Sequence, residues 1–221
     1  MSLRGHYTAE LEQLRLQVEL MAVRVEQNLE RMRAALEEGA PSLHAEAARV
    51  DREVDAMNVS LTERCYELIA REAPVASDLR LIVSVVRVLN ELERISDHAV
   101  RICSDADGEA LAPPGSRLYD LLITMGDEAL ERFHVALRAS GSNDLDLAEG
   151  LATGSPLSDA LHARLIRELL DIDGPDAVAD ALRVAAVARS LERISDHTSV
   201  VGARVRYLIT GDPAHLAAES R

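Results

Sequence analysis

Aromatic residues are nearly absent from this sequence. The chain of 221 residues has no tryptophan, a single phenylalanine and 2% aromatic residues in all, whereas 48% of its residues are hydrophobic. Alanine, leucine, valine, arginine and glutamate dominate instead, which is typical of long helices. The sequence therefore predicts an all-α protein, and its apolar content is sufficient for a buried core.

Cysteines and long apolar runs are scarce as well. Cys65 and Cys103 are the only cysteines, and they form no CxxC motif, so the sequence excludes a disulfide framework and predicts buried, reduced thiols. No window approaches ~18 consecutive apolar residues. The segment from Met1 to Glu12 is polar and lacks the apolar region of a signal peptide. We therefore expect a cytoplasmic protein that is not inserted into a membrane.

Positive charge is also in short supply. The chain has 24 basic and 38 acidic residues, and its formal net charge is −14. Such a charge repels nucleic-acid phosphates and anionic lipids, so neither nucleic acid nor a membrane surface is expected as a direct partner. The ordinary interpretation of this acidity is solubility. The more specific alternative is that the acidic groups bind metal cations or a basic partner surface.

Helix-breaking residues divide the chain into helical segments. No proline or glycine occurs from Tyr7 to Glu38, where apolar residues recur at three- and four-residue steps, so this segment is predicted to be one amphipathic helix. Gly39 ends it, and Pro41 suits the first turn of the next helix. Further helices are expected at 41–71, about 75–105, 116–140 and 176–209, with a short helix, a break and a longer helix in the region 144–170.

The chain contains an internal repeat. The sequence Leu-Glu-Arg-Ile-Ser-Asp-His occurs at 92–98 and again at 191–197. Other similar residues lie 104 positions apart, and Glu93 and Glu192 lie 99 apart. The sequence therefore predicts two tandem antiparallel three-helix bundles. A loop rich in proline and glycine separates them, which places the bundles at 1–110 and 116–211 and a C-terminal tail at 212–221.

Each repeat places two carboxylates on the same face of a helix, because Glu93 and Asp97 are four residues apart. The preceding helix carries a second pair, Asp51 and Asp55. Antiparallel neighbours would bring the two pairs together, and hard cations with oxygen ligands suit such a cluster. The alternative is a solvated acidic face in which Arg101 pairs with Asp97.

The histidines that follow the aspartates are expected to have another role. A helical neighbour one residue further on points ~100° away. His98 and His197 are therefore expected to pack or to make an outer hydrogen bond, and not to bind the same ion.

Four segments together resemble the PhoU family of phosphate-uptake regulators. They are Ala-Pro-Val-Ala-Ser-Asp-Leu-Arg at 73–80, the acidic motifs at 93–97 and 192–196, and Val-Arg-Tyr-Leu-Ile-Thr-Gly at 205–211. The resemblance covers nearly the whole chain and implies two similar three-helix bundles. It also implies that the acidic motifs bind divalent or trivalent metal ions, iron or zinc in some members.

The resemblance implies a set of metal ligands, which we locate residue by residue. Ser155 stands where the second half would have the first acid of a pair, and Gly154 and Pro156 disturb the helix there. The second site is therefore ranked below the first. The predicted ligands are Asp51, Asp55, Asp78, Glu93, Asp97, Asp159, Glu192 and Asp196.

The resemblance further implies a dimeric adaptor without catalytic activity. Such an adaptor couples a phosphate ABC transporter ATPase to a sensor histidine kinase and keeps uptake and starvation signalling low when phosphate is ample. The sequence has no glycine-rich phosphate loop and no GxSxG motif. Two alternatives stay open at this point. One is a carboxylate-bridged metal enzyme, although the acidic motifs of this sequence lack the Glu-x-x-His pair that is usual in such enzymes. The other is a metal-free helical scaffold.

Overall fold

The computed structural model describes residues 3–108 and 110–220, and in these ranges the chain forms helices joined by turns and loops, without strands. The predicted all-α class is confirmed. The ends of the predicted first bundle and of the tail, residues 1, 2 and 221, lie outside the described residues. The elements are α1 (Leu3–Glu38), α2 (Pro41–Glu72), α3 (Ala76–Asp105), α4 (Arg117–Ser142), α5 (Leu145–Ala152), α6 (Pro156–Leu169), α7 (Ala177–Thr210) and the 3-10 helix η1 (Pro213–Ser220).

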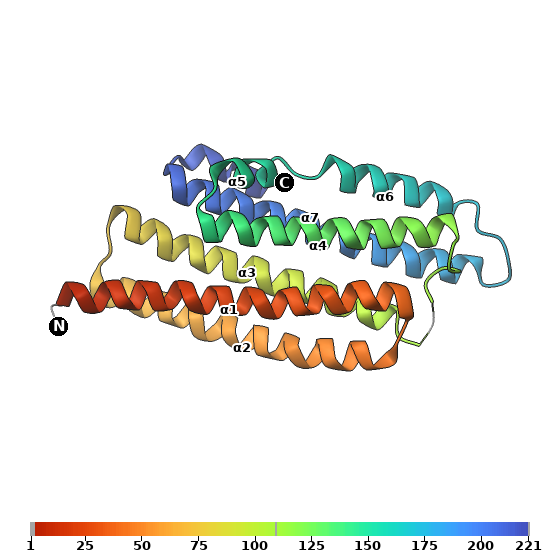
Figure 1. Ribbon diagram of the computed structural model, residues 1–221, viewed down its shortest axis with the longest axis horizontal. Helices are drawn as coiled ribbons and strands as arrows, with labels where there is room; N and C mark the ends of the chain where they lie inside the picture. The colour runs from red at the N-terminus through yellow and green to blue at the C-terminus, as the bar shows by residue number, and fades with distance from the viewer. Residues whose placement is uncertain (1–2, 109, 221) are drawn as a thin grey trace.

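The first half is an antiparallel bundle of the three long helices α1, α2 and α3 (Figure 1). Gly39 adopts a φ of 60°, which a glycine tolerates without strain, and Pro41 starts α2 at a position where its missing N–H costs nothing. Leu29, Met32 and Ile95 are completely buried between these helices. The short turn between α1 and α2 therefore fixes two neighbouring helices in opposite directions.

Most apolar residues that recur at three- and four-residue steps along α3 are buried, among them Ile82, Leu89 and Ile95. Leu79 and Val83 follow the same apolar steps near the start of the helix, but they are 39% and 45% exposed. Leu81 and Val85 are buried instead. Apolar residues occupy adjacent stripes of this helix, and periodicity alone does not distinguish which stripe the neighbouring helices cover.

The second half repeats the arrangement with a broken middle helix. Side chains of Ser116, Asp144 and Ser155 cap the starts of α4, α5 and α6 by accepting hydrogen bonds from backbone N–H groups. The predicted short helix, break and longer helix are confirmed as α5 and α6. α4 is longer than expected, because it continues to Ser142 and ends where Asn143 adopts a φ of 51°.

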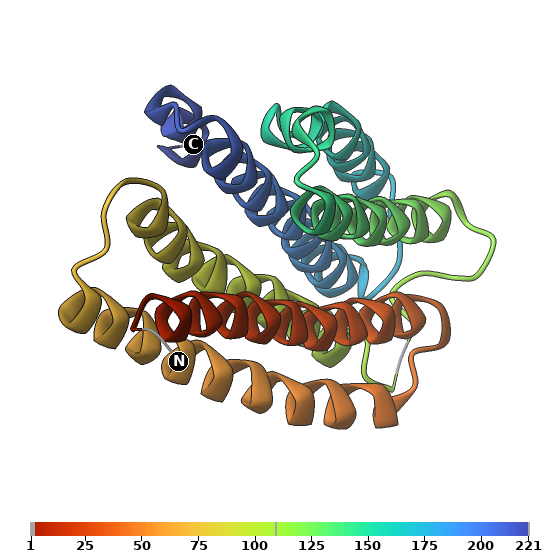
Figure 2. The ribbon, with the colours of Figure 1, turned by 60° about the vertical axis from the view of Figure 1, so that its left-hand side comes forward.

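The two halves lie side by side and are joined chiefly through α3 and α7, the helices that carry the repeated motif (Figures 1 and 2). α1 and α4 also contact each other, and Arg33 of α1 forms an ion pair with Asp127 of α4. Because α3 and α7 form the main contact between the halves, the repeated motifs are held at the centre of the molecule.

Among the described residues, no helix is both long and apolar enough to cross a membrane.

Candidate metal centre

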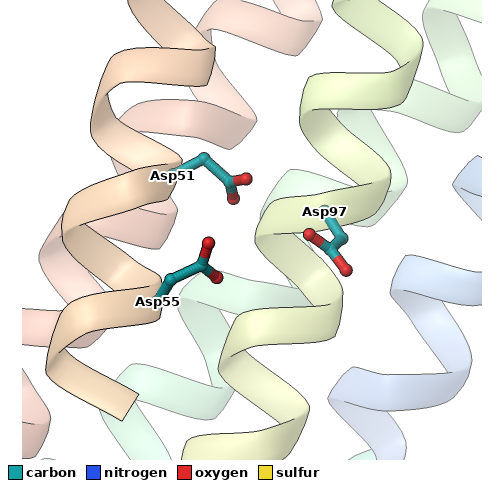
Figure 3. Close-up of side chains that lie close together, drawn as sticks. All are labelled: Asp51, Asp55 and Asp97. Carbon is teal, nitrogen blue, oxygen red and sulfur yellow. The ribbon is translucent and has the colours of Figure 1, made fainter. Parts of the chain in front are cut away.

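Three predicted ligands converge between α2 and α3. Asp51 and Asp55 project from successive turns of α2, and Asp97 faces them from α3 (Figure 3). One carboxylate oxygen from each residue lies within 4.8 Å of the others. Ligand atoms that share one cation at about 2.0–2.6 Å are separated by up to about 5 Å. The spacing therefore fits a single hard cation between the three side chains.

Glu93 completes the acidic group one turn before Asp97 on α3. Burial raises the pKa of Glu93, and the nearby charge of Asp97 raises it further. Burial also raises the pKa of Asp97, together with the charges of Asp51 and Asp55. The carboxylates therefore repel one another in a partly desolvated space, which is the condition that a bound cation relieves.

A hydrogen-bonded chain behind the carboxylates was not predicted. The buried Asn28 of α1 donates from Nδ2 to Ser96 Oγ at 2.9 Å, and Ser96 donates to Asp51 Oδ1 at 2.6 Å. Burial raises the pKa of Asp51, and the Ser96 hydrogen bond opposes that rise. The chain orients Asp51 from the core. Its signal in the sequence is an asparagine inside the apolar stripe of the first helix.

Asp55 and Asp97 are exposed, as the alternative of a solvated acidic face requires, but the ion pair of that alternative is not formed within the residues that the structure describes. Within residues 3–108 and 110–220, none of Asp51, Asp55, Glu93 and Asp97 forms an ion pair with a basic side chain. The charges of Arg94 and Arg101 lower the pKa of Asp97 without forming an ion pair with it. The acidic side chain between the two ligands of α2, Glu53, instead contacts Arg49 and Arg24. The unpaired carboxylates are thus confined to the face between α2 and α3.

The predicted ligands of the second half lie among basic side chains. Glu192 contacts Arg189, and its Oε1 lies 3.2 Å from His162 Nδ1. Asp196 Oδ2 lies 3.1 Å from Nη1 of Arg193. Asp159 is exposed on α6. In the described part of the chain, these three carboxylates do not form a close cluster like that of the first half.

Asp78 lies apart from both groups. It is in the first turn of α3, 19 residues before Asp97 on the same helix, which separates the two Cα atoms by about 28 Å at 1.5 Å per residue. Burial raises the pKa of the Tyr7 phenol, and the nearby charge of Asp78 contributes to that rise. The structure therefore does not bring Asp78 together with the other predicted ligands.

The two motif histidines meet each other across the interface between the halves. The rings of His98 and His197 stack with centroids 5.7 Å apart, and burial lowers the pKa of His98 to about 4. His197 Nδ1 lies 2.7 Å from Oε2 of the buried Glu91. The expected packing role describes both histidines, and they join α3 to α7.

A family model described as the PhoU domain matches the chain twice, over residues 18–106 and 122–205. The two matches begin 104 residues apart and end 99 residues apart, which are the offsets seen in the sequence repeat. Both halves of the molecule are thus covered by one domain type.

Several named proteins are similar to this chain over most of its length. A phosphate-specific transport system accessory protein PhoU homolog of Pseudomonas putida is 32% identical over 213 residues, covering 95% of this chain and 83% of that protein. The phosphate-specific transport system accessory protein PhoU of Escherichia coli (strain K12) is 31% identical over 209 residues, covering 94% and 86%.

Solved structures share the fold. The crystal structure of PhoU from Pseudomonas aeruginosa aligns with a TM-score of 0.87 at 30% identity, covering 93% of this chain and 100% of that one. The phosphate transport system regulatory protein PhoU from Streptococcus pneumoniae aligns with a TM-score of 0.82 at 20% identity, covering 93% and 98%, and this likeness concerns the fold alone.

Proposed function

This chain belongs to the PhoU family, and we propose that it is an accessory protein of a phosphate transport system that keeps phosphate uptake and starvation signalling low when phosphate is ample. The observation that carries the proposal is the similarity to named accessory proteins at about 30% identity over nearly the whole chain. The chain acts by contact and not by catalysis. Its partners are the ATPase of a phosphate ABC transporter and a sensor histidine kinase, and it works in the cytoplasm as a homodimer.

A metal ion at the first-half cluster is part of this proposal. Three carboxylates within reach of one cation, without an ion pair to any described basic side chain, support a divalent or trivalent ion such as iron or zinc. Asp51, Asp55 and Asp97 hold the ion, and Glu93 adds a fourth carboxylate beside it. When bound, the ion neutralises the carboxylates and ties α2 to α3, so it stabilises the surface that the first half presents.

Deletion of the gene tests the regulatory role. In the organism that carries this chain, a phosphate-responsive reporter should be active at high phosphate in the deletion strain, and a wild-type copy should silence it again. A reporter that stays silent at high phosphate in the deletion strain would contradict the proposal. Cross-linking of the full chain in cells then tests the partners, because the transporter ATPase and the sensor kinase should both be captured.

Elemental analysis of protein purified without chelator tests the metal site. The wild-type protein should retain metal, and Asp51→Asn/Asp97→Asn should lose it. Glu53→Gln is the matched control, because it removes a carboxylate from the same helix but from a side chain that contacts Arg49 and Arg24. Equal metal content in the wild type and the double variant would remove this site from the proposal.

A further inference from the structure

The two halves have equivalent positions that can be compared atom by atom. Asn28 of α1 and Arg132 of α4 differ by 104 in number, and each donates a hydrogen bond to a backbone carbonyl, Ala47 O at 3.2 Å and Leu151 O at 3.2 Å. These two acceptors also differ by 104. Burial follows the same offset, because Met21 and Met125 are both buried. The offset therefore identifies which side chain of the second half replaces which of the first.

Every asparagine of the first half is replaced by a basic residue in the second. Residues 1–110 contain three asparagines, one on each helix. At the offsets of 104 for the first two helices and 99 for the third, the pairs are Asn28 and Arg132, Asn58 and His162, and Asn90 and Arg189. Basic side chains in the second half thus take the positions of neutral amides in the first half, one of which, Asn28, is linked through Ser96 to Asp51.

Two of these basic residues hold Glu192. Arg189 lies three residues before it on α7 and forms an ion pair with its carboxylate. His162, from α6, places Nδ1 3.2 Å from Glu192 Oε1. The equivalent acid of the first half, Glu93, has no ion-pair partner among the described residues. Glu192 is therefore occupied on both oxygens by groups of its own chain.

Arg132 of α4 adds a permanent positive charge to the second half. Its Nη2 donates to Ser199 Oγ at 2.8 Å and to Leu151 O, so the guanidinium is held in place. It is half-buried, and burial lowers its pKa, whereas the charges of Glu128, Asp196 and Asp159 raise it. A guanidinium remains protonated at any physiological pH.

The acid that would complete a metal site is also gone. Ser155 occupies the position of Asp51, and it accepts a hydrogen bond from Ser158 N to cap α6. It also donates to Glu128 Oε1 at 3.0 Å. The serine that orients Asp51 in the first half, Ser96, corresponds to Ser195, whose Oγ is buried without a hydrogen-bond partner. The donor set of the second half therefore does not fit a metal ion.

We propose that the side chains of Arg132, His162 and Arg189 take, in the second half, the place that a metal ion takes in the first half, so that the chain binds metal only through its first half. The inference rests on the proposed metal site at Asp51, Asp55 and Asp97. A divalent ion entering the second half would meet a fixed guanidinium and would have to displace basic groups from Glu192. One bundle therefore responds to metal, and the other is held together independently of it.

Binding of Mn²⁺ to the full chain tests this inference, because Mn²⁺ favours carboxylate ligands. Asp159→Asn/Glu192→Gln/Asp196→Asn removes the acids of the second half and should change the Mn²⁺ affinity and stoichiometry by less than twofold. Loss of bound Mn²⁺ in this variant would overturn the inference while leaving the proposed first site in place. An Asp51→Asn/Asp97→Asn variant that binds Mn²⁺ as well as the wild type would instead remove the first site.

Conversion of the second half gives the complementary test. In the Asp51→Asn/Asp97→Asn background, Arg132→Asn/His162→Asn/Arg189→Asn/Ser155→Asp restores the first-half residue at four equivalent positions. This variant should bind Mn²⁺ at least tenfold more tightly than its background, and Mn²⁺ should raise its melting temperature. A folded variant without any gain in Mn²⁺ binding would count against the basic residues as the cause.

A stability measurement keeps the inference testable if the conversion variant does not fold. In chelator, Arg132→Asn should lower the melting temperature, because it leaves the acids of the second half without the half-buried guanidinium of Arg132. Adding Asp196→Asn should recover part of that loss. If Arg132→Asn lowers the melting temperature equally with and without Asp196→Asn, Arg132 does not stabilise these carboxylates.

Discussion

The two halves carry the same seven residues on α3 and α7, but they surround them with different charges. In the first half, Asp51 and Asp55 of α2 approach Asp97 of α3, and no basic side chain of the described residues pairs with them. In the second half, Glu192 and Asp196 pair with arginine and histidine. The difference shows that a repeated motif on one helix does not define a site, because the neighbouring helices decide what the motif faces.

The halves also differ in how closely their helices approach. α2 is one continuous helix of 32 residues, whereas its counterpart is divided into α5 and α6. The division lets the short helix α5 lie against Gly202 of α7, where the first half has the buried Cys103. Burial raises the pKa of the Cys103 thiol to about 12, so this cysteine acts as a small core residue. The second half is therefore packed more tightly at this end.

The largest expected effect comes from replacing Gly202 by cysteine, the residue at the equivalent position of the first half, Cys103. In Gly202→Cys, the new Cβ would lie 2.5 Å from Leu151 Cβ and 3.2 Å from Ala148 O, so α5 and α7 would have to separate. We expect a loss of about 3 kcal/mol in the free energy of unfolding, measured by urea denaturation.

The control is Gly126→Ala, which also restores a first-half residue, Ala22. Its new Cβ meets Leu36 Cδ1 at 2.8 Å, and the end of a flexible side chain can move. A smaller loss is expected there. Similar losses in the two variants would mean that close helix approach is not particular to α5 and α7.

The next effect is metal-dependent stability. At a Mn²⁺ concentration of 100 times Kd, binding to the folded state adds about 2.7 kcal/mol to the free energy of unfolding. The wild type should show this gain in thermal denaturation, and Asp51→Asn/Asp97→Asn should not. Asp159→Asn/Asp196→Asn should keep the full gain. A gain that requires the second-half acids would reverse the comparison between the halves.

A smaller effect is expected where α2 ends. Ala73 adopts a φ of 45° and caps the helix by donating its N–H to Ile69 O. Because the left-handed conformation strains a residue with a Cβ, Ala73→Gly should raise the free energy of unfolding by about 1 kcal/mol. The corresponding helix α6 ends at Leu170 with a φ of −70°. Leu170→Gly should therefore give no gain, and stability measured in urea distinguishes the two positions.

The smallest effect is a pH dependence that belongs to the first half. The pKa values of Asp51, Glu93 and Asp97 are raised above their ordinary values near 3.8 and 4.5, first of all by burial. At pH values between the ordinary and the raised pKa values, the folded state holds more protons than the unfolded chain. The free energy of unfolding therefore falls as pH rises through this range. At neutral pH without metal, the carboxylates therefore destabilise the fold.

The difference between the wild type and Asp51→Asn/Asp97→Asn isolates this contribution from other titrating groups. In chelator at neutral pH, the variant should be more stable by about 0.5 kcal/mol, the scale of one like-charge pair. The advantage should shrink as pH falls below the raised pKa values. A variant that is less stable than the wild type at pH 7 in chelator would show that the carboxylates do not repel one another.

Much of the fold followed from the sequence for simple reasons. Long helices show a strong 3.6-residue periodicity, and glycine and proline mark their ends, so the break between α5 and α6 was predicted from Gly150, Gly154 and Pro156. Periodicity alone does not show that Leu79 and Val83 of α3 are exposed, because the choice between adjacent apolar stripes depends on how the neighbouring helices are rotated.

The candidate site was predictable in part. Acidic residues at i and i+4 must share a face, so the pairs on α2 and α3 were recognisable without a structure. Asn28 and Ser96 were missed, since a buried asparagine and a serine have no fixed spacing from the acids that they serve. Asp78 was included on the basis of family resemblance, and its position at the far end of α3 separates it from the cluster.

By itself, the sequence determined the helices, the duplication and the faces on which Glu93, Asp97, Glu192 and Asp196 lie, because these depend on local geometry within one helix. Only the tertiary structure decided that Asp97 meets Asp51 and Asp55, and that Glu192 meets Arg189 and His162. Contacts between helices depend on their rotation and separation, which the packing of the whole core sets. The same motif therefore lies in a repulsive acidic cluster in one half and among basic side chains of its own chain in the other.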